Sequence, residues 1–294
     1  MELKITDLTK KFQDIAAVDG VSYTLTAGVY GLLGVNGAGK TTLMRMLCTL
    51  LRPTSGSITW DGRDIFEMDG EYRRILGYLP QDFGYYPDFT VYDYLMYIAS
   101  IKGLRPVTAE TRAEALLRQV GLAEARNKKM KKLSGGMKRR AGIAQAMLGD
   151  PRILILDEPT AGLDPNERIR FRNLISELAE ERLVLLSTHI VSDIEYIAGE
   201  ILLMKDGQIK ASGTIQELLA AMPEQVWSVN LPKAAVESYM KSYKVSNVKT
   251  VPGGAQLRII SAKKPADDAA PETATLEDLF LDYFGEQVEG DPEI

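Results

Sequence analysis

The chain has 294 residues, of which 45% are hydrophobic and 26% charged, so it is long enough for two or three compact units. Its formal net charge of −5 argues against a general nucleic-acid binder, because affinity for the phosphate backbone depends on a basic surface, and we expect no nucleic-acid partner. No apolar run reaches the roughly 18 to 20 residues that cross a bilayer, and the first residues lack the features of a secretory signal, so we expect a location in the cytoplasm.

The first part of the chain predicts antiparallel strands, followed by a strand, a loop and a helix. Alternating apolar and polar residues over 3–25 are typical of half-buried antiparallel strands. Val29 to Leu33 is a short apolar run that leads into a glycine-rich loop, and Thr42 to Leu51 has the apolar spacing of a helix. Cys48, the only cysteine, falls on this helix, so we expect a buried thiol and no intrachain disulfide.

The middle of the chain predicts a helical insert within an alternation of buried strands and helices. The insert extends from about residue 85 to 150, with candidate helices at Val91–Ile101, Ala109–Val120 and Gly136–Met147. Buried strands are predicted at Ile75–Leu79, Ile153–Leu156, Leu183–Ser187 and Ile201–Met204, and a helix at Pro165–Glu180. This alternation is typical of a parallel, doubly wound sheet.

The last part of the chain, residues 222–294, predicts a small α/β extension to a first domain of residues 1–221. Strands are expected at Val226–Leu231, Val245–Val251 and Gln256–Ile260. The segment 263–274 is rich in Pro, Ala and Asp and is expected to be a flexible linker, and Leu276–Phe284 is expected to be a short amphipathic helix.

The most specific motif is Gly34-Val35-Asn36-Gly37-Ala38-Gly39-Lys40-Thr41, which fits the phosphate-loop pattern G-x-x-x-x-G-K-[ST]. It follows a predicted strand and opens a predicted helix, as phosphate binding by backbone N–H groups requires. We expect Lys40 to bridge the β- and γ-phosphates of a nucleotide and the hydroxyl of Thr41 to bind Mg²⁺. The expected nucleotide-binding residues of this loop are Asn36, Gly37, Ala38, Gly39, Lys40, Thr41 and Thr42.

Two carboxylates, Asp157 and Glu158, come directly after the buried strand Ile153–Leu156. Asp157 suits the outer shell of Mg²⁺, and Glu158 suits polarisation of an attacking water. Alone, these residues could equally form a solvated turn that begins at Glu158-Pro159. A phosphate loop in the same chain favours the catalytic interpretation.

Gln81 and His189 also follow predicted strands. Gln81 offers an amide oxygen to a metal ion or a water, and the alternative is a surface glutamine. His189 is the only histidine, and it leaves its strand at the edge where ligands bind in open α/β sheets. A lone histidine is more often structural than catalytic, but this position favours a catalytic role.

A second glycine-rich turn, Leu133-Ser134-Gly135-Gly136-Met137, runs into a predicted helix. The start of a helix presents unpaired N–H groups and the positive end of the helix dipole, which suit a nucleotide phosphate. The chain has one copy of this turn and one phosphate loop.

Taken in chain order, these motifs and Gly162-Leu163-Asp164 resemble the nucleotide-binding subunit of an ABC transporter over about residues 1–221. The resemblance implies an ATPase that uses Mg²⁺, with an α/β P-loop NTPase sheet core, an N-terminal antiparallel β-subdomain, the helical insert and the C-terminal α/β extension. It implies that Gln81 belongs to the Q-loop, with a catalytic and metal-binding role, and that His189 is the catalytic switch histidine. The remaining nucleotide contacts that it implies are Phe12 on adenine, Ser134, Gly135 and Gly136 of the signature motif, and Asp164 of the D-loop.

Three positions carry an alternative or depart from the family. Phe12 could equally be a core residue. Met137 replaces the usual glutamine that closes the signature, and Ala161 replaces a frequent serine before Gly162. The residues that would bind phosphate are kept, so we still expect ATPase activity.

The resemblance also implies partners. In this family the signature of one subunit closes over the ATP held by the phosphate loop of the other, so we expect a two-fold homodimer. A separate integral membrane permease is expected as well, which would hold the chain on the cytoplasmic face of the membrane. The resemblance places the groove for the permease in an aromatic segment whose members could also be core residues: Tyr85, Tyr86, Phe89, Tyr92, Tyr94 and Tyr97.

The resemblance also bears on the direction of transport. The segment after Ala221 resembles the extension on ATPase subunits of bacterial exporters of the drug and bacteriocin-resistance type, which favours export. The alternatives are an importer ATPase and a soluble ABC ATPase that acts on ribosomes or DNA. Proteins of the ribosomal kind usually carry two such heads in one chain, and this chain has one.

Overall fold

The computed structural model describes residues 1–179 and 181–285 and divides the chain into two compact units, Met1–Lys210 and Ala211–Ile294. Each unit is described by itself. The predicted boundary after residue 221 falls at the end of helix α9 (Ile215–Ala220), and it stays a prediction for the extent of the ATPase domain. No helix among the described residues is long and apolar enough to cross a membrane.

The N-terminal strands form an antiparallel sheet, as the alternating pattern predicts. Its strand order is β2 (Ile15–Leu25), β1 (Leu3–Phe12), β4 (Ser55–Trp60) and β5 (Arg63–Asp64). Leu3 lies opposite Leu25 on one side and Trp60 on the other, and all three side chains are buried. The apolar face of each strand therefore contributes to one core.

The buried apolar runs form the second sheet of this unit. Its strand order is β10 (Gln208–Gly213), β9 (Glu200–Lys205), β3 (Gly28–Leu33), β8 (Leu183–Thr188), β7 (Ile153–Leu156) and β6 (Leu76–Leu79). The pairs from β9 to β6 are parallel, which confirms the doubly wound prediction. Parallel pairing brings the carboxyl ends of β3, β7 and β8 to one edge.

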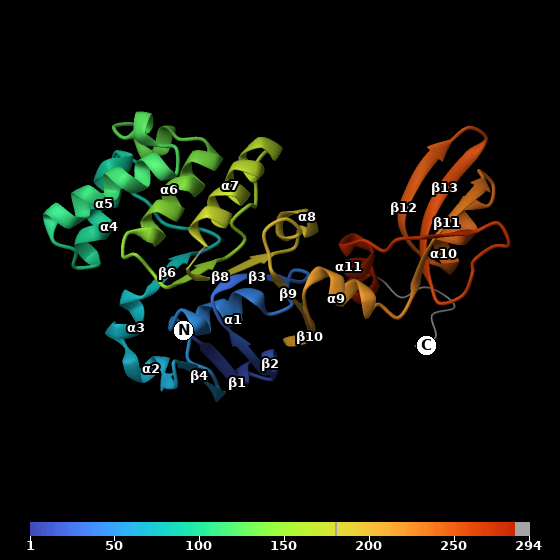
Figure 1. The fold of residues 1–294 in the computed structure, drawn as a ribbon, viewed down its shortest axis with the longest axis horizontal. Coiled ribbons are helices and arrows are strands. Elements are labelled where there is room, and N and C mark those ends of the chain that lie inside the picture. The colour runs from blue at the N-terminus through green and yellow to red at the C-terminus, as the bar shows by residue number, and fades with distance from the viewer. Residues whose placement is uncertain (180, 286–294) are drawn as a thin grey trace. The chain divides into compact units, whose positions relative to one another are not determined.

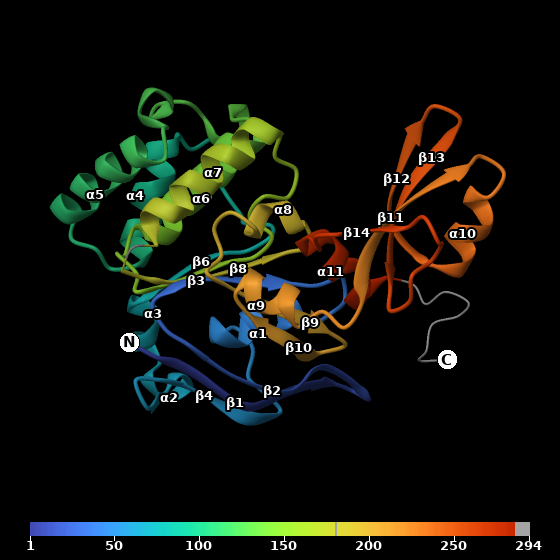
Figure 2. The same cartoon turned by 45° about the vertical axis from the view of Figure 1, so that its right-hand side comes forward.

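Helix α1 (Lys40–Leu47) lies between the two sheets (Figures 1 and 2) and joins their apolar faces into one core. The predicted helix over Thr42–Leu51 is wrong at both ends. The helix starts at Lys40 because Gly39 takes a left-handed conformation at its N-terminus, and it stops before Cys48 because Thr49 has a positive φ of 56°. Leu50 is 64% exposed, whereas Cys48 is buried as predicted.

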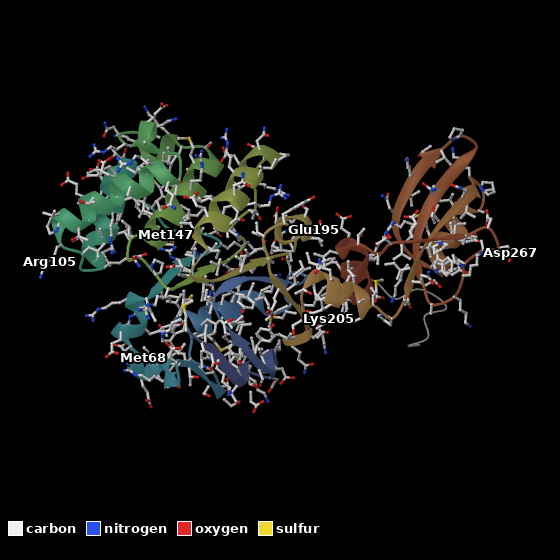
Figure 3. All side chains as sticks on the ribbon, viewed as in Figure 1. Met68, Arg105, Met147, Glu195, Lys205 and Asp267 are labelled. Carbon is white, nitrogen blue, oxygen red and sulfur yellow. The ribbon has the colours of Figure 1, made fainter. Side chains whose placement is uncertain are left out.

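The helical insert contains α4 (Val91–Ile101), α5 (Pro106–Gln119) and α6 (Gly135–Met147), with short 3₁₀ turns at Ala123–Ala125 and Met130–Lys132. Together with α7 (Pro165–Leu178), these helices lie on the opposite side of the parallel sheet from α1 (Figures 1 and 2). Met147 is buried at the end of α6, whereas Arg105 is exposed at the outer end of the insert (Figure 3). The short helices α2 (Ile65–Met68), α3 (Gly70–Arg74) and α8 (Val191–Ile194) are not predicted from the pattern.

The second unit is built on an antiparallel sheet in the order β12 (Lys244–Val251), β13 (Gly254–Ser261), β11 (Gln225–Pro232) and β14 (Ala270–Glu272). Helices α9, α10 (Val236–Ser242) and α11 (Leu276–Phe284) complete it. Three strands and α11 confirm the predictions. The prediction of a flexible linker over 263–274 is wrong for Ala270–Glu272, which pair with β11 at the sheet edge, where a proline is tolerated.

Candidate functional site

The phosphate loop connects β3 to α1 and lines a cavity of about 180 Å³. Gly39 has a φ of +104°, and a Cβ at this position would lie 2.2 Å from the carbonyl oxygen of Ala17. Only glycine fits there, and its missing Cβ lets the loop pass close to the backbone of Ala17 beside the cavity. The residues that line the cavity are Ala17, Asn36, Gly37, Gly39, Lys40, Thr41, Thr42, Gln81 and Glu158.

The ammonium group of Lys40 is held across this loop. Its Nζ donates hydrogen bonds to the carbonyl oxygens of Gly34, at 2.7 Å, and Val35, at 3.0 Å, and the residue is only 6% exposed. Burial lowers the pKa of Lys40, although the charges of Glu158 and Asp157 oppose this shift. A partly desolvated ammonium group at the first residue of a helix suits the binding of phosphate oxygens.

Asp157 stands at the end of β7 with one carboxylate oxygen bonded and the other free. Its Oδ1 accepts hydrogen bonds from the hydroxyls of Ser187, at 2.6 Å, and Thr41, at 3.3 Å. Its Oδ2 is buried and has no hydrogen-bond donor in the described part of the chain. A buried carboxylate oxygen without a partner is costly, so this atom is expected to meet a cation.

The donor set fits Mg²⁺ bound together with a nucleotide. The hydroxyl of Thr41, the free oxygen of Asp157 and the amide oxygen of Gln81 are hard oxygen ligands. Within residues 1–179 and 181–285, no group of three or more His, Cys, Asp or Glu side chains could hold a metal ion alone. Phosphate oxygens and waters would therefore complete the ligand shell, as is usual for Mg²⁺.

Glu158 is fixed at both its backbone and its side chain. Its N–H donates to Ser187 Oγ at 2.9 Å, its carbonyl oxygen accepts from Arg139 Nη2 at 3.1 Å, and its φ is +46°. Its Oε2 lies 3.0 Å from Nδ1 of His189, and its Oε1 lies 3.8 Å from Nζ of Lys40. A carboxylate can only accept, so the hydrogen bond of this pair is donated by Nδ1 of His189 when Glu158 is ionised. Contacts in the structure thus join five of the predicted site residues: Lys40, Thr41, Asp157, Glu158 and His189.

Three residues of this site are absent from the sequence-based prediction. Ser187 bonds both Asp157 and Glu158, Arg139 braces the backbone of Glu158, and Ala17 lines the cavity from β2. The only sequence signal is that β8, an apolar strand, ends in the buried polar pair Ser187-Thr188.

The signature residues lie elsewhere on the chain. Ser134 caps α6 and accepts a hydrogen bond from the N–H of Met137 at 3.2 Å, and Gly135 and Gly136 form the first turn of that helix. Asp164 caps α7 in the same way and accepts from the N–H of Glu167. None of the signature residues 133–137 is among the described residues that line the phosphate-loop cavity. One copy of the chain therefore does not join its two phosphate-binding motifs in one cavity.

Phe12 ends β1 and is 49% exposed, which excludes the alternative that it is a core residue. The Nζ of Lys10 lies 5.3 Å from the centre of its ring. Phe12 does not line the phosphate-loop cavity, but β2, which pairs with β1, contributes Ala17 to that cavity. The ring is free to stack on a base, and this role stays a prediction.

Comparison with known proteins gives one consistent family. The family described as "ABC transporter" matches residues 18–161. The chain is 37% identical over 240 residues to the uncharacterized ABC transporter ATP-binding protein YxlF of Bacillus subtilis, covering 81% of this chain and 79% of the relative. It is 37% identical to the Nod factor export ATP-binding protein I of Burkholderia lata, covering 72% of this chain and 71% of the relative.

Two further similarities concern the chain's extent and its fold. The probable multidrug ABC transporter ATP-binding protein YbhF of Escherichia coli is 37% identical over 96% of this chain. The match covers only 52% of that relative, so this chain spans about half of its length. A solved structure titled as the dimeric, post-hydrolysis state of the ATP-binding cassette MJ0796 bound to ADP and Pi is 25% identical, with a TM-score of 0.65 over 72% of this chain and 98% of that one.

Proposed function

Since this chain belongs to the ABC transporter family, as an ATP-binding subunit that hydrolyses ATP to power transport, we propose that two copies of it enclose two ATP molecules and drive export through a separate membrane permease. The observation that carries the proposed chemistry is the position of Glu158, whose carboxylate lies between Lys40 and His189 at the edge of the phosphate-loop cavity.

In the proposed reaction, the loop residues 36–42 bind the phosphates of ATP and Lys40 contacts the β- and γ-phosphates. Glu158 polarises the attacking water, and His189 holds the carboxylate through the 3.0 Å contact. Thr41, Asp157 and Gln81 would hold Mg²⁺, which neutralises charge on the transferred phosphoryl group when it is bound. Phe12 stacks on the adenine.

The second half of each site comes from the partner copy. Ser134, Gly135 and Gly136 present the N-terminus of α6 and do not line the cavity of their own chain. A two-fold dimer would place them over the ATP of the other copy, with Asp164 at the same interface. The dimeric cassette in the solved relative supports this arrangement.

A groove on the first unit is proposed to dock the permease. Its volume is about 710 Å³, and Ile101, at the end of α4, is 65% exposed on its border. Tyr97 lies one helical turn earlier, so the two side chains share a face of α4. Tyr97 packs edge-to-face on Tyr86 and Phe89, with ring centres 5.2 and 5.8 Å apart. We propose that the aromatic cluster and the groove form one docking surface; the family resemblance predicts its aromatic part.

The charge of this groove suggests its occupant. Its lining includes three basic residues, Arg73, Arg74 and Lys102, and no acidic residue among those that the structure describes. Burial lowers the pKa of Lys102, so a carboxylate near it would be favourable. We therefore propose that an acidic, amphipathic segment on the cytoplasmic side of the permease binds here and keeps the chain at the membrane.

Two experiments test the proposal. ATP hydrolysis by the purified chain should be lost in Glu158→Gln while ATP binding remains, and unchanged hydrolysis would contradict the assigned chemistry. Reconstitution with the membrane protein encoded next to this chain should give ATP-dependent movement of substrate away from the side that holds the ATPase. Movement toward that side would establish import instead.

A further inference from the structure

A buried carboxylate outside the proposed chemistry lies behind the site. Asp193, in the short helix α8, is 2% exposed, and its Oδ2 accepts a hydrogen bond from the hydroxyl of Thr160 at 2.5 Å. Thr160 is itself 2% exposed. Burial of a carboxylate costs hydration free energy, which its hydrogen-bond and charge partners must offset. Packing alone therefore does not explain why an acidic residue occupies this position.

The pair joins the two segments that carry the catalytic side chains. Thr160 lies two residues after Glu158, in a tight turn whose Ala161 N–H donates to the Glu158 carbonyl oxygen at 3.2 Å. Asp193 lies four residues after His189, and its N–H donates to the Ile190 carbonyl oxygen at 3.1 Å. The side-chain bond between Thr160 and Asp193 is therefore a second contact between the two segments that the Glu158–His189 contact joins.

The Asp193 end of this connection is anchored through α8. Nη1 of Arg172, on α7, donates to the carbonyl oxygen of Ser192 at 3.1 Å. Ile194 packs so closely on β3 that a Cβ at Gly31 would lie 3.0 Å from its side chain. Helix α8 is thus held against α7 and the sheet, so the bond to Thr160 ties the turn that carries Glu158 to a fixed element.

The connection continues to the segment before α7. Nη1 of Arg168 lies 4.0 Å from Oδ1 of Asp193, and its Nε donates to the carbonyl oxygen of Leu163 at 3.2 Å. Leu163 directly precedes Asp164, the proposed interface residue. Asp193 and Arg168 therefore bond to the turn from Glu158 to Asp164 at two points, the Thr160 hydroxyl and the Leu163 carbonyl oxygen.

We infer that Thr160 and Asp193 are positioning residues for ATP hydrolysis, whose hydrogen bond sets the separation of Glu158 and His189. The inference rests on the proposed role of Glu158. Neither residue is among the described residues that line the phosphate-loop cavity. Their effect is geometric, and a displacement of about 1 Å at a reacting group can cost on the order of a hundredfold in rate.

Thr160→Val tests this inference, because it keeps the shape of the side chain and removes the donor. We expect kcat for ATP to fall about tenfold or more while KM stays within about threefold, since the phosphate loop is untouched. Thr160→Ser keeps the hydroxyl and should retain kcat. The double variant Thr160→Val/Asp193→Ala should be no slower than Asp193→Ala alone, because Asp193→Ala removes the acceptor of the same bond that Thr160→Val deprives of its donor.

Tyr72→Phe is the matched control. It removes another buried hydrogen bond, from the Tyr72 hydroxyl to the Leu47 carbonyl oxygen at 2.9 Å, and should lower the melting temperature without lowering kcat. The inference is overturned if Thr160→Val keeps full kcat, if Thr160→Ser and Thr160→Val lower kcat equally, or if the effects of the changes at Thr160 and Asp193 on kcat add. Glu158→Gln, measured beside them, separates the two claims: if it leaves hydrolysis unchanged, the proposed chemistry itself fails.

Discussion

Nδ1 of His189 lies 3.0 Å from Oε2 of Glu158, although the two residues are carried by different strands of the parallel sheet. The other carboxylate oxygen of Glu158 lies 3.8 Å from Nζ of Lys40. One carboxylate therefore contacts both the phosphate loop and the histidine. This arrangement orients a group that can accept hydrogen bonds toward the place where the γ-phosphate of ATP would lie.

Replacement of Glu158 with glutamine should abolish turnover and spare binding. The amide has the same shape but cannot polarise a water as strongly, so kcat should fall by about 10²- to 10⁴-fold while the Kd for ATP changes by no more than a few-fold. Steady-state ATPase assays and equilibrium nucleotide binding measure the two quantities. Glu177→Gln, an exposed change on α7, is the control and should leave both unchanged.

Replacement of Asp157 with asparagine should raise the requirement for Mg²⁺. The buried Oδ2 loses its charge, whereas the amide oxygen can still accept from Ser187. We expect the Mg²⁺ concentration at half-maximal ATPase activity to rise about tenfold or more, because a carboxylate next to Mg²⁺ contributes through its charge. Nucleotide binding without Mg²⁺ should stay the same. An unchanged Mg²⁺ dependence would contradict the assignment of Asp157.

Charge reversal in the groove should weaken binding of the permease without affecting ATP chemistry. Arg74→Glu places a negative charge where an acidic segment is proposed to bind. Co-purification with the membrane protein should fall, while ATP hydrolysis by the separate chain stays unchanged. Arg105→Glu, an exposed change at the outer end of the insert, is the control. Equal loss of co-purification in both variants would argue against a specific groove.

Asp278 should stabilise the second unit against unfolding to an extent that depends on pH. Burial raises the pKa of this carboxyl, but hydrogen bonds from Arg258, Ser246 and Thr275 outweigh burial and leave the pKa below its ordinary value. Because the folded pKa is lowered, the stabilisation is present above the ordinary carboxyl pKa of about 4 and is lost as the pH falls through the folded pKa.

Asp278→Asn should therefore lower the free energy of unfolding at pH 7 by roughly 2 to 3 kcal/mol, the value of hydrogen bonds to a buried charge. The difference from the unmodified chain should shrink as the pH falls below about 4. The difference in the free energy of unfolding is measured by denaturant unfolding, followed by the fluorescence of Trp227 in a Trp60→Phe background. A difference that does not change with pH would contradict the lowered pKa.

The sequence predicts the parts of the site that are local in the chain. Lys40 and Thr41 belong to one motif whose strand, loop and helix are contiguous. Ser187 could not be assigned, because its role depends on the pairing of Leu156 with Leu186, which places it beside Asp157 and Glu158. Composition alone likewise cannot show that Ala270–Glu272 pair with β11. Both of these omissions depend on strand pairing between distant segments.

The central claim is that each ATP site combines Lys40 of one copy with Ser134 of the other, and one pair of heterodimers tests it directly. In the first, one copy carries Lys40→Ala and the other carries Ser134→Ala. In the second, both changes are on the same copy and the other copy is unmodified. The measurement is the amount of ADP formed per dimer in a single turnover.

The account predicts that the first heterodimer keeps one complete site, formed by the unmodified Lys40 and the unmodified Ser134, and forms about one ADP per dimer. The second should form almost none, because each of its sites contains one change. Activity in the second heterodimer and none in the first would show that each copy closes its own site, and it would contradict the claim.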